Sequence, residues 1–499
     1  MVAQAEILDW QARIEQHAQD FGLDFFPTVF QMVTFEQMNE IAAYGGFPTR
    51  YPHWTFGMEH ERLAKSYAYG LSKIYELVVN TNPCYAYLLE CNPLVDQKLV
   101  MAHVYGHCDF FKNNLYFAHT NRKMMDELAN HGMRIRRYMS KHGFEAVESL
   151  LDDCQCVDNL IDLHSTFIKR RVEVRTAADL FEERERQTAR RLPASDYMER
   201  YINPPDFVAE QERKLVEEET SQRRLPERPE RDVLLFLLEH APLDNWQREV
   251  LALIREEAYY FAPQGQTKIM NEGWASFVHS NLMTKQLATD AEIVDYAEHH
   301  SGTMGRRPGS LNPYKLGLEL LRDIEARWDK GQFGKEWDEC DDFERRRAWD
   351  TGAGLGRQKL FEVRKLYSDV TFIDEFLTPE FCAEQGLFAY DYDDDDNLYR
   401  IASRQFPDIK RKLLFQLTNF GQPHIAVMDA NHENRGELYL KHDHEGLDLK
   451  MREARDTLHS LYRLWKRPVH LETVVDDWNV VLTFTGSEDK DEKLREVDD

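Results

Sequence analysis

The chain has 499 residues, too many for one ordinary hydrophobic core, and this length predicts two or three domains. Hydrophobic residues make up 42% of the sequence and aromatic residues 12%, which excludes a wholly disordered chain. The formal net charge of -26 repels the phosphate backbones of DNA and RNA, so we expect no nucleic acid as the main partner.

The targeting and cysteine patterns favour a cytoplasmic protein. The amino-terminal residues show no basic stretch followed by an apolar run. No apolar stretch reaches the roughly 18 residues that a membrane-spanning helix needs. The seven cysteines are an odd number in a long chain, which fits reduced thiols better than a disulfide framework. We therefore expect a cytoplasmic protein without a membrane span.

The first part of the chain predicts mainly helices. Residues 1–45 predict helix, because apolar side chains recur on one stripe. The apolar run 85–91 predicts a strand, and Pro93 then predicts the first turn of a further helix. From about 168 to 232, arginine and glutamate dominate, which indicates a charged helical insertion on the surface.

The last hundred residues predict a small α+β unit. Apolar segments bounded by turn residues predict strands, and one helix is expected between the third and the fourth. These strands are expected at 413–418, 424–428, 437–441, 469–473 and 479–484. The fold class expected for the whole chain is α+β. A mainly helical domain, 1–398, would carry a metal site, and a small α+β domain would span 399–499.

Two histidines one turn apart are the strongest chemical signal. His103 and His107 share one face of a predicted helix on which nearly every other position from 99 to 111 is apolar, so both rings should be buried. A spacing of four residues lets both rings reach one metal ion about 2 Å from each nitrogen. The structural alternative is a pair of core histidines bonded to carboxylates.

A second predicted helix, further along the chain, carries Glu272 and His279. Joined to the histidine pair, Glu272 completes a His₂Glu set, which in catalytic zinc sites leaves one coordination position open. Two helical turns, on the order of 10 Å, separate Glu272 from His279. We therefore expect His279 to contact a ligand histidine or the substrate. The alternative for Glu272 is that it only caps its helix.

Other candidates lie in two further segments. Glu59 and His60 are adjacent, so a helix would direct only one of them toward a site, and Glu59 has an alternative partner in Arg62. His300 and Tyr314 flank a loop rich in glycine and proline. Such a loop suits a substrate-facing edge, although its composition is also that of ordinary turns.

Several of these segments together resemble the SpoVR family, which comprises stage V sporulation protein R and relatives in bacteria that form no spores. The segments that carry the resemblance are 51–62, 80–87, 103–114, 269–275 and 308–317. The resemblance implies a bacterial cytoplasmic protein linked to spore cortex formation or, elsewhere, to stress and stationary phase. It also implies a PrkA-type serine kinase and a von Willebrand-like protein as partners. It supplies no reaction.

The histidine pair also resembles, more distantly, the gluzincin peptidases, which combine an H-E-x-x-H helix with a downstream glutamate ligand. This resemblance implies a zincin-like main domain. The sequence departs from the pattern at Val104, where such a peptidase has its general base. Glu59, Glu90 and Asp109 are the candidates to replace it. Burial in an aromatic segment should raise the pKa of Glu59 into the range of a base, whereas Glu90 could instead anchor a ligand histidine.

The leading hypothesis is a metal-dependent hydrolase of amide bonds. His103, His107 and Glu272 would hold Zn²⁺, which lowers the pKa of a bound water and polarises the carbonyl. Glu59 would act as the base. An oxyanion would be stabilised by Tyr314 or His300.

Two alternatives remain open from the sequence. An iron-dependent redox enzyme would need further carboxylate ligands, such as Glu59, Glu90 or Glu256, and the Glu-x-x-His pairs typical of such sites are missing. A regulatory scaffold without catalysis would bind the kinase through the C-terminal unit. Val104 favours the scaffold, and the open coordination position favours the hydrolase.

Overall fold

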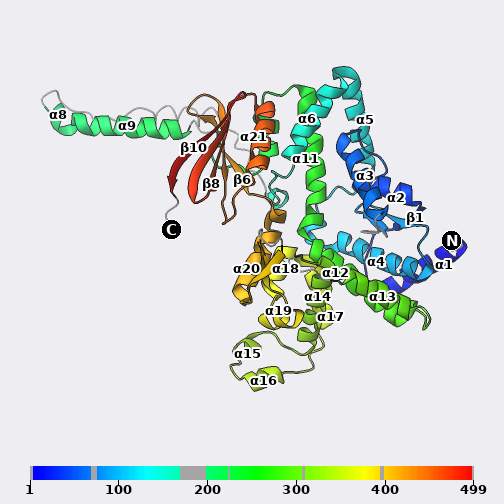
Figure 1. Ribbon diagram of the computed structural model, residues 1–499. Helices are drawn as coiled ribbons and strands as arrows, with labels where there is room; N and C mark the ends of the chain where they lie inside the picture. The colour runs from blue at the N-terminus through cyan, green and yellow to red at the C-terminus, as the bar shows by residue number, and fades with distance from the viewer. Residues whose placement is uncertain are drawn as a thin grey trace. The chain divides into compact units, whose positions relative to one another are not determined.

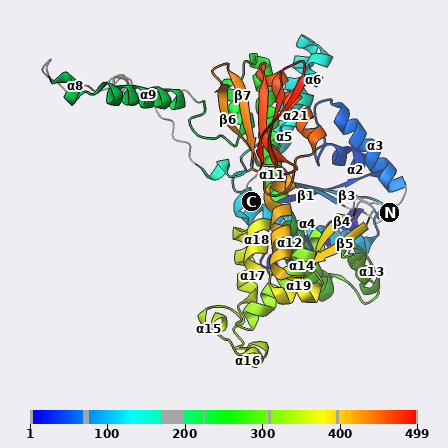
Figure 2. The same ribbon diagram turned by 60° about the vertical axis from the view of Figure 1, so that its left-hand side comes forward.

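The computed structural model shown in Figures 1 and 2 describes residues 4–68, 76–168, 198–222, 225–305, 310–393 and 398–496. The chain divides into two compact units. Met1–Val147 and Tyr259–Gln422 form the first, and Glu148–Ala258 with Pro423–Asp499 forms the second. Each unit therefore combines segments that are distant in the sequence.

The first unit is mainly helical. Its helices are α1 (Gln4–Asp20), α2 (Phe35–Ala43), α3 (Trp54–Ala68), α4 (Leu94–Asn113), α5 (Met124–His142), α12 (Lys268–Leu282), α13 (Ile293–Thr303), α14 (Pro313–Asp329), α15 (Lys335–Asp338), α16 (Phe343–Arg347), α17 (Gly356–Leu366), α18 (Asp369–Phe376), α19 (Pro379–Gln385) and α20 (Phe406–Leu417). Its strands are β1 (Thr28–Val33), β2 (Glu76–Val79), β3 (Cys84–Leu89), β4 (Ala389–Asp393) and β5 (Leu398–Ser403). The unit boundaries fall within α6 (Phe144–Cys156) and α11 (Asn245–Gln266).

Helix α4 lies at the centre of the first unit and is buried along almost its whole length. On one face, Tyr105 packs against Phe25 and Phe30, beside the sheet of order β1-β3-β2. On another face, α4 packs against α12 and α13, and α12 packs in turn against α14 (Figure 2). A helix that is apolar all round needs such cover on every side.

The helices α4, α12 and α14 approach one another at glycines. A Cβ atom added to Gly106 would lie 2.7 Å from the Cα of Ala275, and one added to Gly273 would lie 2.5 Å from the Cα of Gly317. Ordinary carbon contacts are about 3.5–4.0 Å. The backbones of the three helices therefore meet directly, and any larger residue at these positions would push them apart.

The second unit contains a five-stranded sheet of order β10-β9-β8-β7-β6 (Figure 1). Its strands are β6 (Ile425–His432), β7 (Glu437–His442), β8 (Val469–Val475), β9 (Trp478–Phe484) and β10 (Asp489–Glu496). Only the β7–β8 pair is parallel. Helix α21 (Met451–Trp465) connects that pair and packs on the sheet. The unit also contains α8 (Glu199–Ile202), α9 (Pro205–Gln222), α10 (Val233–His240) and the parts of α6 and α11 between residues 148 and 258.

The expected α+β class, with a mainly helical larger part and a small C-terminal sheet, is confirmed. Four of the five predicted C-terminal strands are present, together with the helix between them. The strand predicted at 413–418 is wrong, because these residues belong to helix α20. Ile409, Leu413 and Leu417 follow a helical period and pack on the core of the first unit.

The prediction of continuous helix over residues 1–45 is also wrong, because β1 interrupts it and pairs in parallel with β3. Residues 169–197, 223 and 224 of the expected charged insertion lie outside the described residues, and its described part includes the helices α8 and α9.

The expected domain boundary between residues 398 and 399 falls in the β4–β5 hairpin. The second compact unit instead combines residues 148–258 with a C-terminal segment that begins at Pro423. Independent folding of 399–499 stays a prediction, and a cut at Pro423 would leave the hairpin intact.

Candidate metal centre

His103, His107 and Glu272 come together where α4 crosses α12. Each histidine Nε2 lies 3.5 Å from Oε2 of Glu272, and three potential ligand atoms lie within 4.8 Å of one another. Both histidines are buried, with 4% and 6% of their surfaces exposed. This is the one such group among the residues that the structure describes. The three residues predicted from the sequence as metal ligands therefore meet in space.

The spacing of these atoms fits a metal ion better than a hydrogen bond. Two donor atoms that each lie about 2 Å from an ion in tetrahedral coordination are about 3.3 Å apart. Nitrogen–oxygen hydrogen bonds are typically about 2.7–3.2 Å long. The two distances of 3.5 Å to Glu272 lie closer to the first value. Two imidazoles and one carboxylate are also a donor set that zinc accepts.

The opposite nitrogen of each histidine is held by a residue of α12. His107 Nδ1 lies 2.9 Å from Oδ1 of Asn271, and His103 Nδ1 lies 2.8 Å from Nδ1 of His279. An amide oxygen only accepts hydrogen bonds, so Asn271 places the proton of His107 on Nδ1 and leaves the Nε2 lone pair toward Glu272. Asn271 and His279 therefore anchor the two histidines, and the contact of His279 with a ligand histidine is the one expected from the sequence. An anchoring role of Glu90 stays a prediction.

Burial keeps His107 in the neutral form that binds metals, and it acts on His279 in the same direction. Burial, together with the nearby His103, lowers the pKa of His107 to about 4. Burial and the neighbouring His103 and His300 lower the pKa of His279 well below its ordinary value. Protons therefore compete little with a metal at neutral pH.

A cavity of about 110 Å³ opens beside His103. Tyr314 and His300, both expected at the site, line it with His279. The Tyr314 ring stacks near His103, with centroids 6.2 Å apart, and its hydroxyl group is hydrogen-bonded to Glu272. His300 Nδ1 lies 3.3 Å from Nε2 of His279. The α13 and α14 residues therefore belong to the same site as the metal-ligand candidates.

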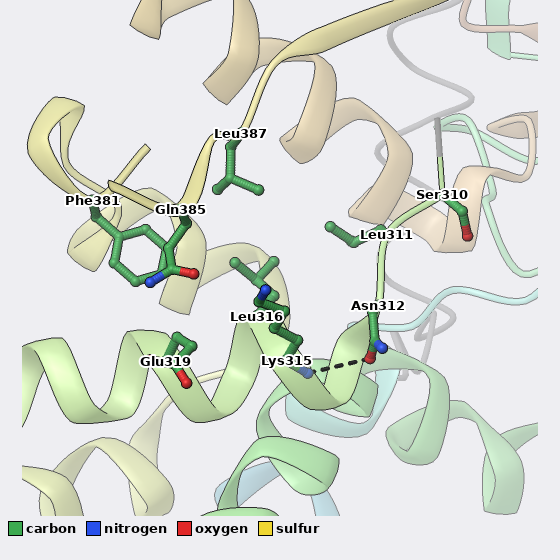
Figure 3. A pocket seen from close by; sticks show the side chains of 9 residues that line it. All are labelled: Ser310, Leu311, Asn312, Lys315, Leu316, Glu319, Phe381, Gln385 and Leu387. Atoms are coloured by element: carbon green, nitrogen blue, oxygen red, sulfur yellow. Dashed lines mark hydrogen bonds between the residues drawn. The ribbon is translucent and has the colours of Figure 1, made fainter. Parts of the chain in front are cut away.

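A second, smaller hollow of about 40 Å³ lies along α14 (Figure 3). Lys315, Leu316 and Glu319 of this helix face Phe381 and Gln385 of α19. It shares no lining residue with the cavity beside His103. We therefore assign it no part in the metal centre.

Glu59 and His60 lie on α3, and neither lines the cavity beside His103. Arg62 binds both carboxylate oxygens of Glu59, at 2.6 and 2.8 Å. Hydrogen bonding to Arg62 lowers the pKa of Glu59, so the expectation of a raised pKa was wrong. A base role for Glu59 stays a prediction without support from its surroundings.

The observed contacts of Asp109 are structural, and its role as a base stays a prediction. Asp109 is fully buried, forms an ion pair with Arg364 and accepts a hydrogen bond of 2.8 Å from Trp274 Nε1. It thereby ties α4 to α12 and α17. Glu90 follows β3, and its backbone amide donates to the Val33 carbonyl.

The sequence reasoning missed Asp369, which fixes the beginning of α12. Its two carboxylate oxygens accept hydrogen bonds from the backbone amides of Ile269 and Met270, at 2.8 and 2.9 Å. Burial raises the pKa of Asp369 to about 7. No local signal marks this contact, because Asp369 lies about a hundred residues downstream. The close helix contacts, in contrast, do have a sequence signal, because a glycine inside a helix often marks a close approach of two backbones.

Comparison with known proteins identifies the family. Residues 2–422 match the family described as SpoVR like protein, and residues 423–476 match the SpoVR-like C-terminal domain. This chain belongs to the SpoVR family. It is 31% identical over 521 residues to the uncharacterized protein YcgB of Escherichia coli (strain K12), which covers 96% of this chain and 94% of that protein.

The border between the two family matches, at residues 422 and 423, coincides with a border between the compact units. No solved structure matches the chain, so the zincin-like fold is not confirmed. Among the described helices, none is both long and apolar enough to cross a membrane.

Proposed function

We propose that this protein is a metal-dependent hydrolase of amide bonds, with Zn²⁺ held by His103, His107 and Glu272. The observation that carries the proposal is the pair of 3.5 Å distances from Glu272 to the two histidines, next to a cavity. A bound zinc ion would lower the pKa of a water ligand and polarise a substrate carbonyl.

The surrounding residues would orient this chemistry. Asn271 and His279 hold the two imidazoles with Nε2 toward Glu272. Tyr314 stands over His103, and its hydroxyl group would have to exchange its hydrogen bond with Glu272 in order to donate to the oxyanion that forms when the carbonyl is attacked. His300, on the cavity wall, is a second donor of this kind.

Position 104 supplies no base, because Val104 is an alkyl side chain and fully buried. A gluzincin peptidase uses both the metal and a glutamate base to activate water. In the proposed mechanism the metal would do this without a base at position 104. A carboxylate-rich iron site receives less support, since Glu272 is the only carboxylate in the ligand cluster.

The physiological setting is proposed from the family alone. We propose a cytoplasmic protein that acts in spore cortex formation or in stress and stationary phase. A PrkA-type serine kinase and a von Willebrand-like protein are its proposed partners.

Metal analysis of the purified full-length chain tests the proposal. We expect about one equivalent of zinc per chain, and we expect its loss in the His103→Ala, His107→Ala protein. His131→Ala is the matched control, because His131 is also buried but lies on α5, outside the cluster. Iron in place of zinc would support the redox alternative. Wild-type protein without bound metal would support the hypothesis of a regulatory scaffold without catalysis.

A second experiment tests whether Asn271, which is hydrogen-bonded to His107, supports zinc binding. Asn271→Leu should weaken zinc binding about 10- to 100-fold, because the ring loses the acceptor that orients it. Competition with a chromophoric chelator measures this affinity. Zinc-loaded protein that cleaves no peptide or muropeptide would remove the hydrolase while keeping the metal site.

A further inference from the structure

The cavity beside His103 lies directly against the candidate metal centre. His103, a candidate ligand, lines it, and so does Tyr314, whose hydroxyl group is hydrogen-bonded to another candidate ligand, Glu272. Residues of the helices α4, α12, α13 and α14, all in the first unit, form its wall. A carbonyl group bound to a metal at this centre would therefore have the cavity as the neighbouring space for the rest of its acyl group.

The volume of the cavity, about 110 Å³, limits what it can hold. For comparison, an apolar cavity of about 150 Å³ holds one benzene molecule, and a water molecule occupies about 30 Å³ in the liquid. The cavity therefore has room for about four groups of the size of a methyl group or a water molecule. An aromatic side chain or a long alkyl chain exceeds this space.

The wall of the cavity provides little for a charged ligand. Asp96 is the only carboxylate among the described residues that line it, and Asp96 is already ion-paired with Nδ1 of His299. None of the described lining residues is a lysine or an arginine. Moving a charged group out of water costs free energy unless a partner of opposite charge receives it. The cavity therefore favours an uncharged group.

Leu99 and Val100 of α4 form an apolar part of the wall. Leu99 is four residues before His103, so the two side chains share one face of the helix. Methylene groups gain free energy when they leave water for such a surface. A short alkyl chain attached to a metal-bound carbonyl would therefore find apolar surface within one helical turn of a candidate ligand.

We propose that the substrate is an amide of a short, uncharged acyl group, from acetyl to butyryl in size, and that this acyl group occupies the cavity against Leu99 and Val100. This inference rests on the proposed function, because the carbonyl of the cleaved bond must lie at His103, His107 and Glu272. Leu99 is a specificity residue in this arrangement, since its side chain limits the space for the acyl chain.

A series of straight-chain hydroxamates tests the inference on the zinc-loaded full-length protein. The hydroxamate group binds zinc, and its alkyl chain stands for the acyl group of the substrate. Calorimetric titration should show butyrohydroxamate binding about tenfold more tightly than acetohydroxamate, because two further methylene groups leave water. Octanohydroxamate should bind no more tightly than butyrohydroxamate, because its chain exceeds the cavity.

Two charged compounds of similar length test the preference for an uncharged group. 4-Aminobutanohydroxamate carries a cation, and succinic monohydroxamate carries a carboxylate. Both should bind more weakly than butyrohydroxamate, because each would lose water without gaining a partner of opposite charge.

The Leu99→Ala protein should accept longer chains, because the smaller side chain enlarges the cavity. The affinity for hexanohydroxamate relative to butyrohydroxamate should therefore rise above the wild-type ratio. Leu414→Ala is the matched control, because Leu414 of α20 is also a partly buried leucine on the same hydrophobic core but does not line the cavity. Should Leu99→Ala fail to fold, the series of compounds still decides the matter on wild-type protein.

Zinc content is measured before each titration, and the titrations need no turnover, so the outcomes separate. Wild-type protein that takes up no zinc contradicts the proposed function and this inference with it. Zinc-loaded protein overturns the inference alone if its affinity keeps rising up to octanohydroxamate, if it prefers a charged compound, or if it binds none of the series. The metal centre would then remain in place.

Discussion

Histidine and glutamate side chains lie close together both in the helical centre of the first unit and on the sheet of the second unit, but their geometry differs. On the sheet, His470 forms hydrogen bonds through both ring nitrogens, to Glu437 at 2.8 Å and to Thr483 at 2.9 Å. Glu437 also binds Arg435 at 2.7 Å. At the helical centre, two histidines instead direct their Nε2 atoms to one carboxylate at 3.5 Å.

This difference shows that histidine and glutamate in proximity do not by themselves indicate a metal site. The sheet residues satisfy one another at hydrogen-bond distance, and an arginine balances the carboxylate charge. The helical residues converge at the longer separation that an ion between them would need. Three predictions test this difference between the two regions.

The largest effect is expected from removing the charge of one glutamate in each region. Glu272→Gln should weaken zinc binding more than about 100-fold, beyond the range typical of residues that only support a ligand. Glu437→Gln should leave the zinc content unchanged, because Glu437 serves the sheet. Elemental analysis after dialysis measures both proteins. Equal loss of zinc in the two would remove the distinction between the regions.

The second prediction concerns the stability of metal-free protein at acid pH. The folded pKa of His107 is about 4, against an ordinary value of 6.5. Between these values the unfolded chain binds a proton that the folded chain does not. The contribution of His107 to the free energy of unfolding is therefore fully present above pH 6.5 and is lost as the pH falls toward 4. The shift corresponds to about 3 kcal/mol.

Urea unfolding of the first unit, followed at pH 7 and pH 4.5 in the presence of a chelator, measures this loss. His107→Gln should show a shallower dependence on pH, because the glutamine side chain does not titrate. The same slope in both proteins would mean that the pH dependence comes from other groups.

The smallest effect is expected at the helix crossings. A Cβ atom at Gly317 would lie 2.2 Å from the carbonyl oxygen of Ile269, so Gly317→Ala should lower the stability of the first unit by about 1–3 kcal/mol. Gly57→Ala is the control, since no atom outside its chain neighbours and its own helix backbone lies within 4 Å of its added Cβ, and alanine favours the helix α3. Chemical denaturation compares them, and a neutral Gly317→Ala would argue against the backbone contact.

The sequence predicted those parts of the site that depend on local periodicity. His103 and His107 share a face because a helix repeats about every 3.6 residues, whatever packs around it. Strands β6 to β9 were similarly visible as apolar segments between turn residues. Helix α20 was not, because a short apolar run fits a strand or a buried helix equally well.

Partners within one helix could also be found from the sequence. Arg62, one turn from Glu59, was its alternative partner and binds it. Partners on different helices could not be found in this way. The pairing of Asn271 with His107 depends on how α12 crosses α4, and the sequence alone carries no such angle.

The direct backbone contacts at Gly106 and Gly273 have a consequence for how the family can diversify. Gly106 adjoins His107 and sets the distance between the ligand helices α4 and α12, and Gly273 adjoins Glu272 and sets the distance between α12 and α14. Neither distance depends on a cavity side chain. Substitutions at Leu99 or His299 could therefore retune which molecules enter while the metal ligands stay in register. For a protein engineer, the cavity wall is the part to randomise and the glycines are the part to leave alone.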